Sequence, residues 1–479
     1  MNYRLVAQTI GKLLIVIALA MCFPLFLAIA DRSPDRFAFA VSILITLLAG
    51  VLLSMLKSSG TPGRKEGFAI VSLGWITATA LGALPLVFSG AVPTYTDAFF
   101  EVMSGFTTTG STVIPAVEVV PRGILLWRSM TQWLGGMGII VLSLALFSFS
   151  KTGTALFQAE VPGHIADRIL PRLGKSAGML WLIYTIITVT MIIALCMVGM
   201  PLFESIVHTF TTVSTGGFSV RNISIEAYHS PAVEVIIIFF MILCGMNFAL
   251  FYRVVQKKSL RPLFGDAETR GYLAIVLAAF VIITVSLITS MNLPFFESVR
   301  QAAFQTASII TTTGFSNTNF DLWPALAKGI LLVLMFIGAS TSSTAGAIKV
   351  ARILLLFKYF KRQIQKAINP RLILQTKLGN TVISDTVMHE ILAFFFMYIC
   401  LFVLGALIVM GTGQDIVTSI SASATAIGNN GPGLGAVGPY SNYSGLHAIA
   451  KWTLSFLMLA GRLEILTLLS LFSTRFWRD

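Results

Sequence analysis

The sequence predicts an all-α polytopic membrane protein with about ten transmembrane helices, most of them arranged in four similar units. Its residues are 56% apolar and only 11% charged, which is far from the composition of soluble globular domains. Apolar runs long enough to span a bilayer recur along the whole chain and leave no room for a sizeable soluble domain. The predicted spans are Leu5–Ala30, Phe37–Leu56, Phe68–Phe88, Ile124–Phe149, Met179–Met200, Val233–Val254, Tyr272–Ser290, Ala325–Leu356, Glu390–Met410 and His447–Phe472.

The first two spans precede the repeated units and are predicted to form an extra pair of helices, residues 1–66. The first span has some features of a signal peptide, because Arg4 and Lys12 precede an apolar core that ends in Ala28-Ile-Ala30. Its apolar stretch is longer than a signal peptide needs. We therefore interpret it as a retained first helix.

The remaining chain repeats one unit, in which a span, a short segment, a glycine-bearing segment and a second span follow one another. An acidic residue opens each short segment: Asp97, Glu204, Glu297 and Asp415. The first two acids precede the glycine of their unit by the same offset, and the other two by about one more helical turn.

A segment too short to cross a bilayer is predicted to be a half-helix that enters the membrane and returns as extended backbone. The chain of each unit then crosses the membrane and returns to the side on which it began. All four repeats are therefore parallel, unlike the inverted repeats of many secondary transporters. The predicted units are residues 67–150, 151–258, 259–377 and 378–479.

Each unit carries one polar glycine segment between its apolar parts. Polar backbone is costly in hydrocarbon unless it is buried in protein or lines water. A single such glycine is explained more simply by a tight turn or close helix packing, but four in equivalent places indicate four walls of one pore. The segments are Thr107-Thr-Thr-Gly-Ser-Thr112, Thr212-Val-Ser-Thr-Gly-Gly-Phe-Ser219, Thr311-Thr-Thr-Gly-Phe-Ser316 and Gly428-Asn-Asn-Gly431.

A pore of this kind can replace the water shell of a monovalent cation with backbone carbonyl oxygens. Glycine adopts the backbone angles that aim successive carbonyls inward, and the C-terminal ends of half-helices add partial negative charge. The hydroxyl groups of Thr108, Thr109, Thr312 and Thr313 can add further oxygen atoms.

A second polar stretch, Gly338-Ala-Ser-Thr-Ser-Ser-Thr-Ala-Gly346, interrupts the span that follows the third glycine segment. A continuous helix is possible there, since Ser and Thr can bond to helix backbone and small residues allow close packing. Nine small or hydroxyl-bearing residues in a row favour a break at a water-lined site instead.

Two cations accompany this stretch at membrane depth, Lys349 directly after it and Arg462 in the last span. An intramembrane arginine usually faces a cavity, and a positive charge in a cation pore repels the ion. We therefore expect Arg462 to reach the 338–346 stretch and to act there as a barrier or latch. The alternatives are a structural ion pair and, for Lys451, snorkelling to the outer surface.

The net charge of +13 follows largely from topology. The basic loops around 57–65, 151–175, 253–270, 358–377 and 475–478 fall on one face together with the N-terminus, and the positive-inside rule makes that face, and so both termini, cytoplasmic. Nucleic-acid binding is not needed to explain the charge, although anionic lipid or an acidic protein would suit it.

The face opposite the basic loops carries acids that could attract cations to an outer mouth, or that simply begin helices. They are Asp97, Glu101, Glu118, Glu204, Glu226, Glu297, Asp321 and Asp415.

The residues do not favour an enzyme. The acids within spans, Glu234, Glu390 and Glu464, are far apart, and the cysteines and histidines show neither metal-ligand nor catalytic spacing. The chain contains no Walker A sequence and no dinucleotide fingerprint, so nucleotide control would have to come from a partner. We expect no cofactor bound by this chain.

Taken together, these features resemble the Trk/Ktr/HKT superfamily of potassium transporters, most closely its bacterial TrkH-type members. The resemblance covers nearly the whole chain, including the extra helix pair. Its motifs are specific as a set, although each alone is weak: Phe106-Thr-Thr-Thr-Gly110, Ser214-Thr-Gly-Gly-Phe-Ser219, Thr312-Thr-Gly-Phe-Ser316, Ile427-Gly-Asn-Asn-Gly431 and Gly461-Arg-Leu-Glu464.

The resemblance implies one selectivity-filter glycine from each repeat and a gate made by an intramembrane loop beneath the filter. The filter residues expected to bind K⁺ are Thr108, Thr109, Gly110, Thr215, Gly216, Gly217, Thr312, Thr313, Gly314, Asn429, Asn430 and Gly431. The gate residues are Gly338, Ala339, Ser340, Thr341, Ser342, Ser343, Thr344, Ala345, Gly346, Lys349 and Arg462.

The resemblance also implies partners. The family conducts K⁺ and often Rb⁺, forms dimers with a separate pore in each subunit, and pairs with a cytosolic TrkA-type regulatory ring that binds NAD(H) or ATP/ADP. The expected docking surface for that ring is Lys151–Lys175, Arg253–Arg270 and Lys358–Lys377. Attraction of these loops to lipid is the alternative.

The predicted function is potassium uptake across a bacterial inner membrane through a gated, channel-like pore. None of the four segments contains Thr-Val-Gly-Tyr-Gly, and the fourth replaces threonines with Asn429 and Asn430, so we expect K⁺ and Rb⁺ to be preferred without strict exclusion of Na⁺. Gly110 favours K⁺, because a serine at this position accompanies Na⁺ transport in plant relatives. A secondary transporter that couples K⁺ to H⁺ or Na⁺ is the alternative. Parallel repeats and the lack of a proton-relay acid favour the channel.

Overall fold

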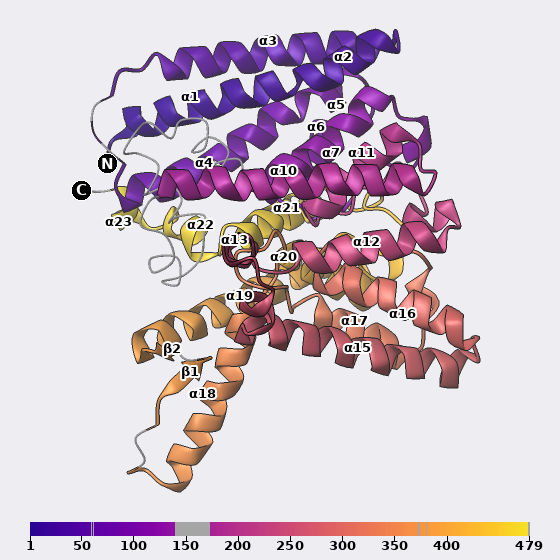
Figure 1. The fold of residues 1–479 in the computed structure, drawn as a ribbon. Coiled ribbons are helices and arrows are strands. Elements are labelled where there is room, and N and C mark those ends of the chain that lie inside the picture. The colour runs from indigo at the N-terminus through magenta and orange to yellow at the C-terminus, as the bar shows by residue number, and fades with distance from the viewer. Residues whose placement is uncertain (59, 61, 139–172, 372–373, 380, 478–479) are drawn as a thin grey trace.

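A computed structural model describes the chain except residues 59, 61, 139–172, 372–373, 380 and 478–479. The chain forms a helical bundle from which one helix and a small hairpin project (Figure 1). At the N-terminus, α1 (Tyr3–Ala20) and α2 (Cys22–Ala30) make one span, and α3 (Asp35–Ser54) packs against α1. The two predicted N-terminal helices are therefore confirmed as helices.

The long apolar helices are the spans of the bundle. Within the described residues, six helical segments are long and apolar enough to cross a membrane, or seven if a sharply bent pair counts as one span. The helices that stand before a glycine segment in the chain are α4 (Arg64–Gly82) with α5 (Leu84–Phe88), α10 (Leu173–Met197), α15 (Ala267–Met291) and α19 (Asp385–Gly411). Those that follow a glycine segment are α7 (Arg122–Gly136), α12 (Pro231–Cys244), α17 (Ala325–Leu334) and α21 (Ala448–Arg462).

Four short helices end where the four glycine segments begin, as predicted. They are α6 (Tyr95–Phe106), α11 (Leu202–Val213), α16 (Phe295–Ile310) and α20 (Ile416–Gly428). The predicted acids lie at their N-terminal ends, where the helix dipole favours negative charge: Asp97 is in the first turn of α6, and the Asp415 side chain accepts the Thr418 N–H at 3.0 Å. Most residues of α6 and α20 are buried, so these helices lie inside the bundle.

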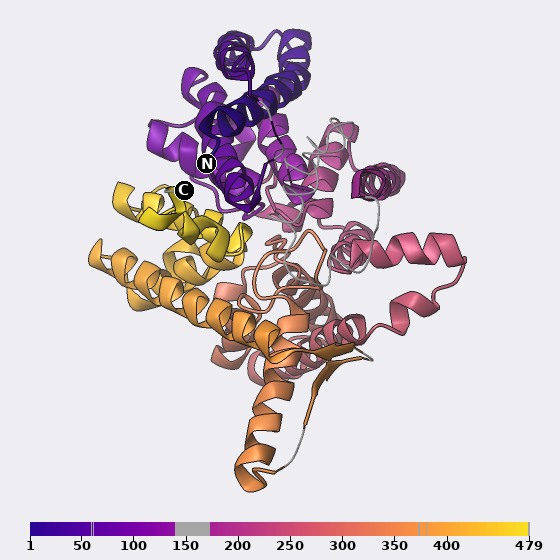
Figure 2. The ribbon, with the colours of Figure 1, turned by 90° about the vertical axis from the view of Figure 1, so that its left-hand side faces the viewer.

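The chain order runs around the centre of the bundle when it is viewed from one end (Figure 2). Contacts between α7 and α11, α12 and α16, and α21 and α6 join neighbouring parts of the chain around this centre. Each glycine segment is followed in the chain by a short 3-10 turn: η1 (Val117–Val119), η3 (Ser224–Tyr228), η4 (Phe320–Leu322) and η5 (Gly435–Val437).

The predicted span Val233–Val254 is wrong as a continuous helix. Instead α12 meets α13 (Phe248–Lys257) at an angle of 91°. The break arises because the 338–346 stretch supplies alternative hydrogen-bond partners: Ser340 N–H donates to the Gly245 carbonyl at 2.9 Å, and Phe248 N–H donates to the Ser342 carbonyl at 3.1 Å. The short helix α14 (Arg261–Phe264) follows α13.

The predicted span His447–Phe472 is also interrupted. Helix α21 ends at Arg462, and α22 (Leu466–Ser470) begins after Glu464 and Ile465, whose φ angles are +58° and +44°. The turn directs the Glu464 carboxylate to Arg352. Of the predicted span Ile124–Phe149, the part beyond α7 falls largely outside the described residues.

The predicted interruption within Ala325–Leu356 is confirmed. Helix α17 ends at Leu334, and α18 (Val350–Ile368) begins only after the loop that contains residues 338–346. Helix α18 projects from the bundle together with β1 (Thr376–Leu378) and β2 (Thr381–Ile383), which pair antiparallel with Thr376 opposite Ile383 (Figure 1). At the other limit of the chain, α23 (Thr474–Trp477) lies beside α1, since the Tyr3 hydroxyl donates to the Trp477 carbonyl at 3.1 Å.

Candidate functional site: a ring of glycine segments above a polar loop

The four predicted filter glycines lie together. Gly110, Gly217, Gly314 and Gly431 all line one cavity of about 90 Å³. Neighbouring segments touch: a Cβ atom on Gly110 would overlap the Gly216 carbonyl oxygen, one on Gly217 would overlap the Thr313 carbonyl oxygen, and one on Gly314 would lie 2.8 Å from the Gly431 nitrogen. A Cβ on Gly431 would lie 3.1 Å from the Gly110 oxygen, which closes the ring.

The backbone follows the same path at the start of each segment. The residue two places before each ring glycine is left-handed, with φ of +54°, +57°, +56° and +55° at Thr108, Thr215, Thr312 and Asn429. The next residue then donates its N–H to a backbone carbonyl of the preceding short helix. The distances are 2.8 Å from Thr109 to Ser104, 2.7 Å from Gly216 to Thr211, 2.9 Å from Thr313 to Ser308 and 2.9 Å from Asn430 to Thr425. Each glycine segment is thereby held by its own helix.

The fourth wall departs from this pattern at the glycine. Gly110, Gly217 and Gly314 have φ between +77° and +85°, but Gly431 is not left-handed. Pro432 follows Gly431, and a proline restricts the residue before it to extended conformations. The Gly431 carbonyl also accepts hydrogen bonds from the Ser111 hydroxyl at 3.0 Å and the Tyr443 hydroxyl at 3.1 Å. The backbone at the ring glycine is therefore similar in three walls and different in the fourth.

Several oxygens at the ring have no protein donor. Among the described residues, the carbonyl oxygens of Gly110, Gly217 and Gly314 accept no hydrogen bond. The buried Thr108 hydroxyl and the side-chain oxygen of Asn429 likewise have no partner in the described part of the chain. Oxygens in this state are available to a dehydrated cation, which must replace its water ligands.

The threonine hydroxyls differ in their partners. The Thr109 and Thr313 hydroxyls lie 2.8 Å from those of Thr107 and Thr311, while the Thr312 hydroxyl accepts the Gly346 N–H at 2.8 Å. Thr312 therefore joins the glycine ring directly to the 338–346 stretch.

The 338–346 loop packs against the glycine ring and lines a second cavity. A Cβ on Gly346 would lie 2.5 Å from the Gly428 carbonyl oxygen and 2.7 Å from the Asn429 Cβ atom, so the loop packs against the underside of the glycine ring. The second cavity, of about 140 Å³, is lined by loop residues 342–346 together with Lys349, Arg462 and Glu464. The Gly338 N–H donates to the Ile348 carbonyl at 2.9 Å and brings the ends of the loop together.

The predicted gate residues all lie in the 338–346 loop or, as Lys349 and Arg462 do, line the same cavity as the loop. Ala339 and Ser340 are fully buried; the Ala339 carbonyl accepts the Val350 N–H at 3.1 Å, and the Ser343 hydroxyl donates to the Ser340 carbonyl at 2.6 Å. The Thr344 hydroxyl donates to the Val213 carbonyl at 3.2 Å, at the end of a neighbouring short helix.

The predicted contact between Arg462 and this loop is confirmed. The Arg462 guanidinium donates to the Thr344 carbonyl at 2.8 Å and to the Gly135 and Gly136 carbonyls of α7 at 2.7 and 3.1 Å. The Lys349 ammonium donates to the carbonyls of Ala345 and Gly346. Both cations therefore bind carbonyls that the broken helices and the loop leave open.

Sequence reasoning missed Glu268 in the first turn of α15. Its buried carboxylate accepts the Thr341 N–H at 2.6 Å, the Thr341 hydroxyl and the Ala351 N–H at 3.1 Å. The residue holds both the loop and the start of α18. No local pattern distinguished it from the other acids in the sequence.

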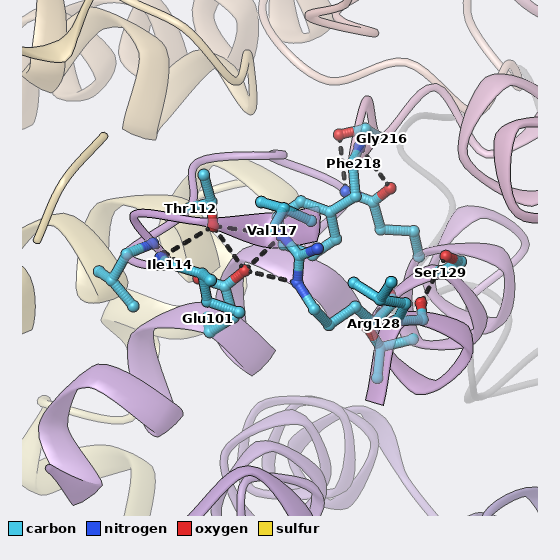
Figure 3. Close-up of polar contacts among 12 residues, drawn as sticks. Glu101, Thr112, Ile114, Val117, Arg128, Ser129, Gly216 and Phe218 are labelled. Carbon is cyan, nitrogen blue, oxygen red and sulfur yellow. Dashed lines mark hydrogen bonds and ion pairs between the residues drawn. The ribbon is translucent and has the colours of Figure 1, made fainter. Parts of the chain in front are cut away.

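Three of the acids that could attract cations to an outer mouth are paired with cations. Glu101 is fully buried and pairs with Arg128 at 2.7 Å, as Figure 3 shows. Asp97 pairs with Lys451 at 2.6 Å, and Glu204 pairs with Arg221 at 2.8 Å. Burial raises the pKa of Glu226 above its ordinary value.

Lys451 therefore does not extend to the surface, contrary to one alternative above. It is buried, it binds Asp97 and the Ser444 carbonyl at 2.8 Å, and it joins α21 to α6. The charges of Arg128 and Lys451 inside predicted spans were the available signal for two of these pairs, but the sequence does not identify their partners.

We expect Lys451→Met to destabilise the protein strongly, because it leaves the Asp97 carboxylate buried without its cation. Breaking a buried ion pair typically costs about 3–5 kcal/mol, whereas replacing both partners with apolar residues is often neutral. The melting temperature of the purified protein should fall clearly for Lys451→Met and recover in the Lys451→Met/Asp97→Leu variant. A single variant no less stable than the double would contradict this role for the pair.

The sequence profile of the TrkH family, described as a cation transport protein, matches residues 35–478. The chain is 36% identical to the Trk system potassium uptake protein TrkH of Salmonella typhimurium and 37% identical to that of Halomonas elongata, with all of both chains covered in each case. The crystal structure of the potassium transporter TrkH from Vibrio parahaemolyticus superposes with a TM-score of 0.91 at 33% identity, covering 100% of both chains.

Proposed function

The chain belongs to the TrkH family of cation transport proteins, and on this premise we propose that it takes up potassium across a bacterial inner membrane through a gated, channel-like pore. The main support is the closed ring of Gly110, Gly217, Gly314 and Gly431 around one cavity. The relatives' names specify potassium uptake. The multi-pass helical bundle agrees with a membrane transporter.

The ring would select ions by replacing their water shell. The unpartnered carbonyl oxygens of Gly110, Gly217 and Gly314 are suitable ligands for a dehydrated monovalent cation. The fourth wall offers a Gly431 carbonyl that already accepts two hydroxyl groups, so it is a weaker ligand. An incomplete ring agrees with preference for K⁺ and Rb⁺ over Na⁺ without strict exclusion of Na⁺.

The 338–346 loop would be the gate. It packs against the glycine ring through Gly346 and lines the cavity that contains Lys349 and Arg462, so an ion that passes through the ring would meet the loop next. Opening then requires loss of the contacts that hold the loop, those of Arg462 and Glu268 above all.

The proposed arrangement in the cell has the basic surfaces and both termini in the cytoplasm. A homodimer with one pore in each subunit and a TrkA-type ring that binds NAD(H) or ATP/ADP are the proposed assembly. Docking is proposed at Arg253–Arg270 and Lys358–Lys377, which include α14 and the end of the projecting α18. The third proposed docking segment, Lys151–Lys175, falls almost entirely outside the described residues.

The test is uptake of ⁸⁶Rb⁺ into liposomes that contain the purified protein alone, with K⁺ and Na⁺ as competitors. We expect uptake down an imposed electrical gradient, inhibited much more strongly by K⁺ than by Na⁺. Uptake that requires an added H⁺ or Na⁺ gradient would instead establish a coupled transporter. Absence of Rb⁺ uptake under both conditions, from protein that folds normally, would contradict potassium transport.

Neutralising Glu268 should increase this uptake. Glu268→Gln keeps the shape of the side chain but removes the negative charge of the carboxylate, to which two N–H groups and one hydroxyl group donate hydrogen bonds. Hydrogen bonds to charged groups contribute about 1.5–3 kcal/mol each, so loss of part of this set should raise the ⁸⁶Rb⁺ uptake rate roughly tenfold. Asp266→Asn is the matched control, since Asp266 caps α15 through Thr269 N–H at 2.8 Å. Equal uptake by both variants would show that Glu268 does not restrain the loop.

A further inference from the structure

The second wall of the ring lacks a side chain that the other walls have. Thr109, Gly216, Thr313 and Asn430 occupy the position directly before the four ring glycines. In the first and third walls, this threonine lies 2.8 Å from the hydroxyl of Thr107 or Thr311. Those hydroxyls in turn donate to carbonyls of the same short helix, at 2.6 Å in both walls. Side-chain hydrogen bonds thus hold each of these two glycine segments to its own short helix.

Gly216 has no side chain to make such hydrogen bonds, and a residue from the first unit takes its place. Gln132 on α7 is fully buried. Its amide nitrogen donates to the Gly216 carbonyl at 2.6 Å, and its amide oxygen accepts the Phe218 N–H at 3.1 Å. A Cβ atom on Gly216 would overlap the Gln132 amide carbon. The missing side chain of Gly216 and the inserted amide of Gln132 therefore fit each other.

The helix that carries Gln132 is itself firmly held. One turn earlier, Arg128 pairs with the buried Glu101 at 2.7 Å, and its guanidinium lies 4.2 Å from the centre of the Phe218 ring. Glu101 also accepts the Val113 N–H at 2.7 Å, just after the first ring glycine. Figure 3 shows Arg128 between Glu101 on one side and Phe218 and Gly216 on the other. These contacts join the first and second walls into one unit.

We propose that Gln132 is a specificity-determining residue, which fixes the second wall so that the ring cannot contract around a smaller cation. The inference rests on the proposed function as a potassium pore. Gln132 touches the filter backbone, so it acts as a positioning residue and not as an ion ligand. A ring whose second wall can move closes around Na⁺ at lower cost, and discrimination between ions falls while the path stays open.

The experiment compares three variants in liposomes by their ratio of ⁸⁶Rb⁺ to ²²Na⁺ uptake. Gln132→Leu keeps the size of the side chain but removes both hydrogen bonds. Gln301→Leu is the matched control, because Gln301 is a mostly buried glutamine whose amide donates to Glu297 on its own helix at 3.1 Å. Gln132→Ala combined with Gly216→Thr restores the arrangement of the first and third walls. Gly216 is not left-handed, so its backbone accepts threonine.

We expect the uptake ratio to fall roughly five- to tenfold in Gln132→Leu, which corresponds to a loss of about 1–1.4 kcal/mol in discrimination between the two ions. Gln301→Leu should keep the ratio of the unaltered protein, and the double variant should return most of it. A folded Gln132→Leu protein with an unchanged ratio would overturn the proposal. If that variant does not fold, the double variant decides: recovery of folding and ratio supports the proposal, and failure of either overturns it.

A second readout separates this inference from the proposed function. The rise in melting temperature when K⁺ replaces Na⁺ measures ion binding without transport. This rise should shrink in Gln132→Leu and persist in Gln301→Leu. If the unaltered protein takes up no Rb⁺, the proposed function fails. Gln132 is then judged by the melting temperatures alone, and an equal rise in both variants overturns its role.

Discussion

Gly217→Ala is expected to abolish ⁸⁶Rb⁺ uptake, whereas Gly431→Ala should retain a measurable part of it. At Gly217 the φ angle is +77°, and an added Cβ would overlap the Thr313 carbonyl oxygen of the next wall. Left-handed backbone alone costs roughly 1–2 kcal/mol for a residue with a side chain, and the overlap forces two walls apart. At Gly431 the backbone is not left-handed, and the nearest atom to a Cβ lies at 3.1 Å.

Alanine substitution at the four ring glycines should therefore reduce uptake to different degrees. We expect more than a hundredfold loss of uptake at Gly217 and Gly110, an intermediate loss at Gly314, and a loss of roughly tenfold or less at Gly431, because each 1.4 kcal/mol corresponds to about tenfold. Equal losses at all four positions, in proteins of normal stability, would show that the glycines serve a purpose other than close approach of the walls. Gly110→Ser tests the same position for Na⁺ entry.

Arg462→Ala should raise the basal uptake of Rb⁺ by roughly ten- to a hundredfold. The guanidinium joins the Thr344 carbonyl of the loop to the Gly135 and Gly136 carbonyls of α7. Without it the loop loses charge-assisted hydrogen bonds worth about 1.5–3 kcal/mol each, and the second cavity loses a positive charge that repels cations. Unchanged or lower uptake by a normally expressed Arg462→Ala protein would contradict the latch.

Arg462→Lys distinguishes the two causes. Lysine keeps the positive charge, but its single ammonium group cannot bridge several carbonyls with the fixed geometry of a guanidinium. If the hydrogen bonds hold the gate, Arg462→Lys should also raise uptake, although less than alanine. If repulsion of the ion dominates, Arg462→Lys should behave like the unaltered protein.

Local sequence signals were sufficient for much of this fold and site. Runs of apolar residues located the six helical segments of the described residues that are long and apolar enough to cross a membrane. The acids Asp97 and Asp415 marked the beginnings of short helices that the structure contains. Glycine among threonine, serine or asparagine residues located the ring and the 338–346 loop. These signals work because each depends on a few neighbouring residues, through helix period, capping and backbone angle.

The features that sequence reasoning missed depend on distant partners. The bend after Cys244 is stabilised by hydrogen bonds to Ser340 and Ser342, and an isolated apolar run gives no sign of it. Lys451 and Asp97 are 354 residues apart in the chain. Gln132 and Gly216 belong to different units, so a glutamine in an apolar span could not be assigned to the glycine it supports.

The unequal walls of the ring have an evolutionary consequence. In a pore built from four identical subunits, every substitution appears four times, and a change tolerable in one wall can be intolerable when it is multiplied. Here a single gene encodes each wall separately, so Pro432 can follow one ring glycine and Gln132 can support another. Under the proposed function, mutation can therefore alter ion preference through one wall at a time, in small heritable steps.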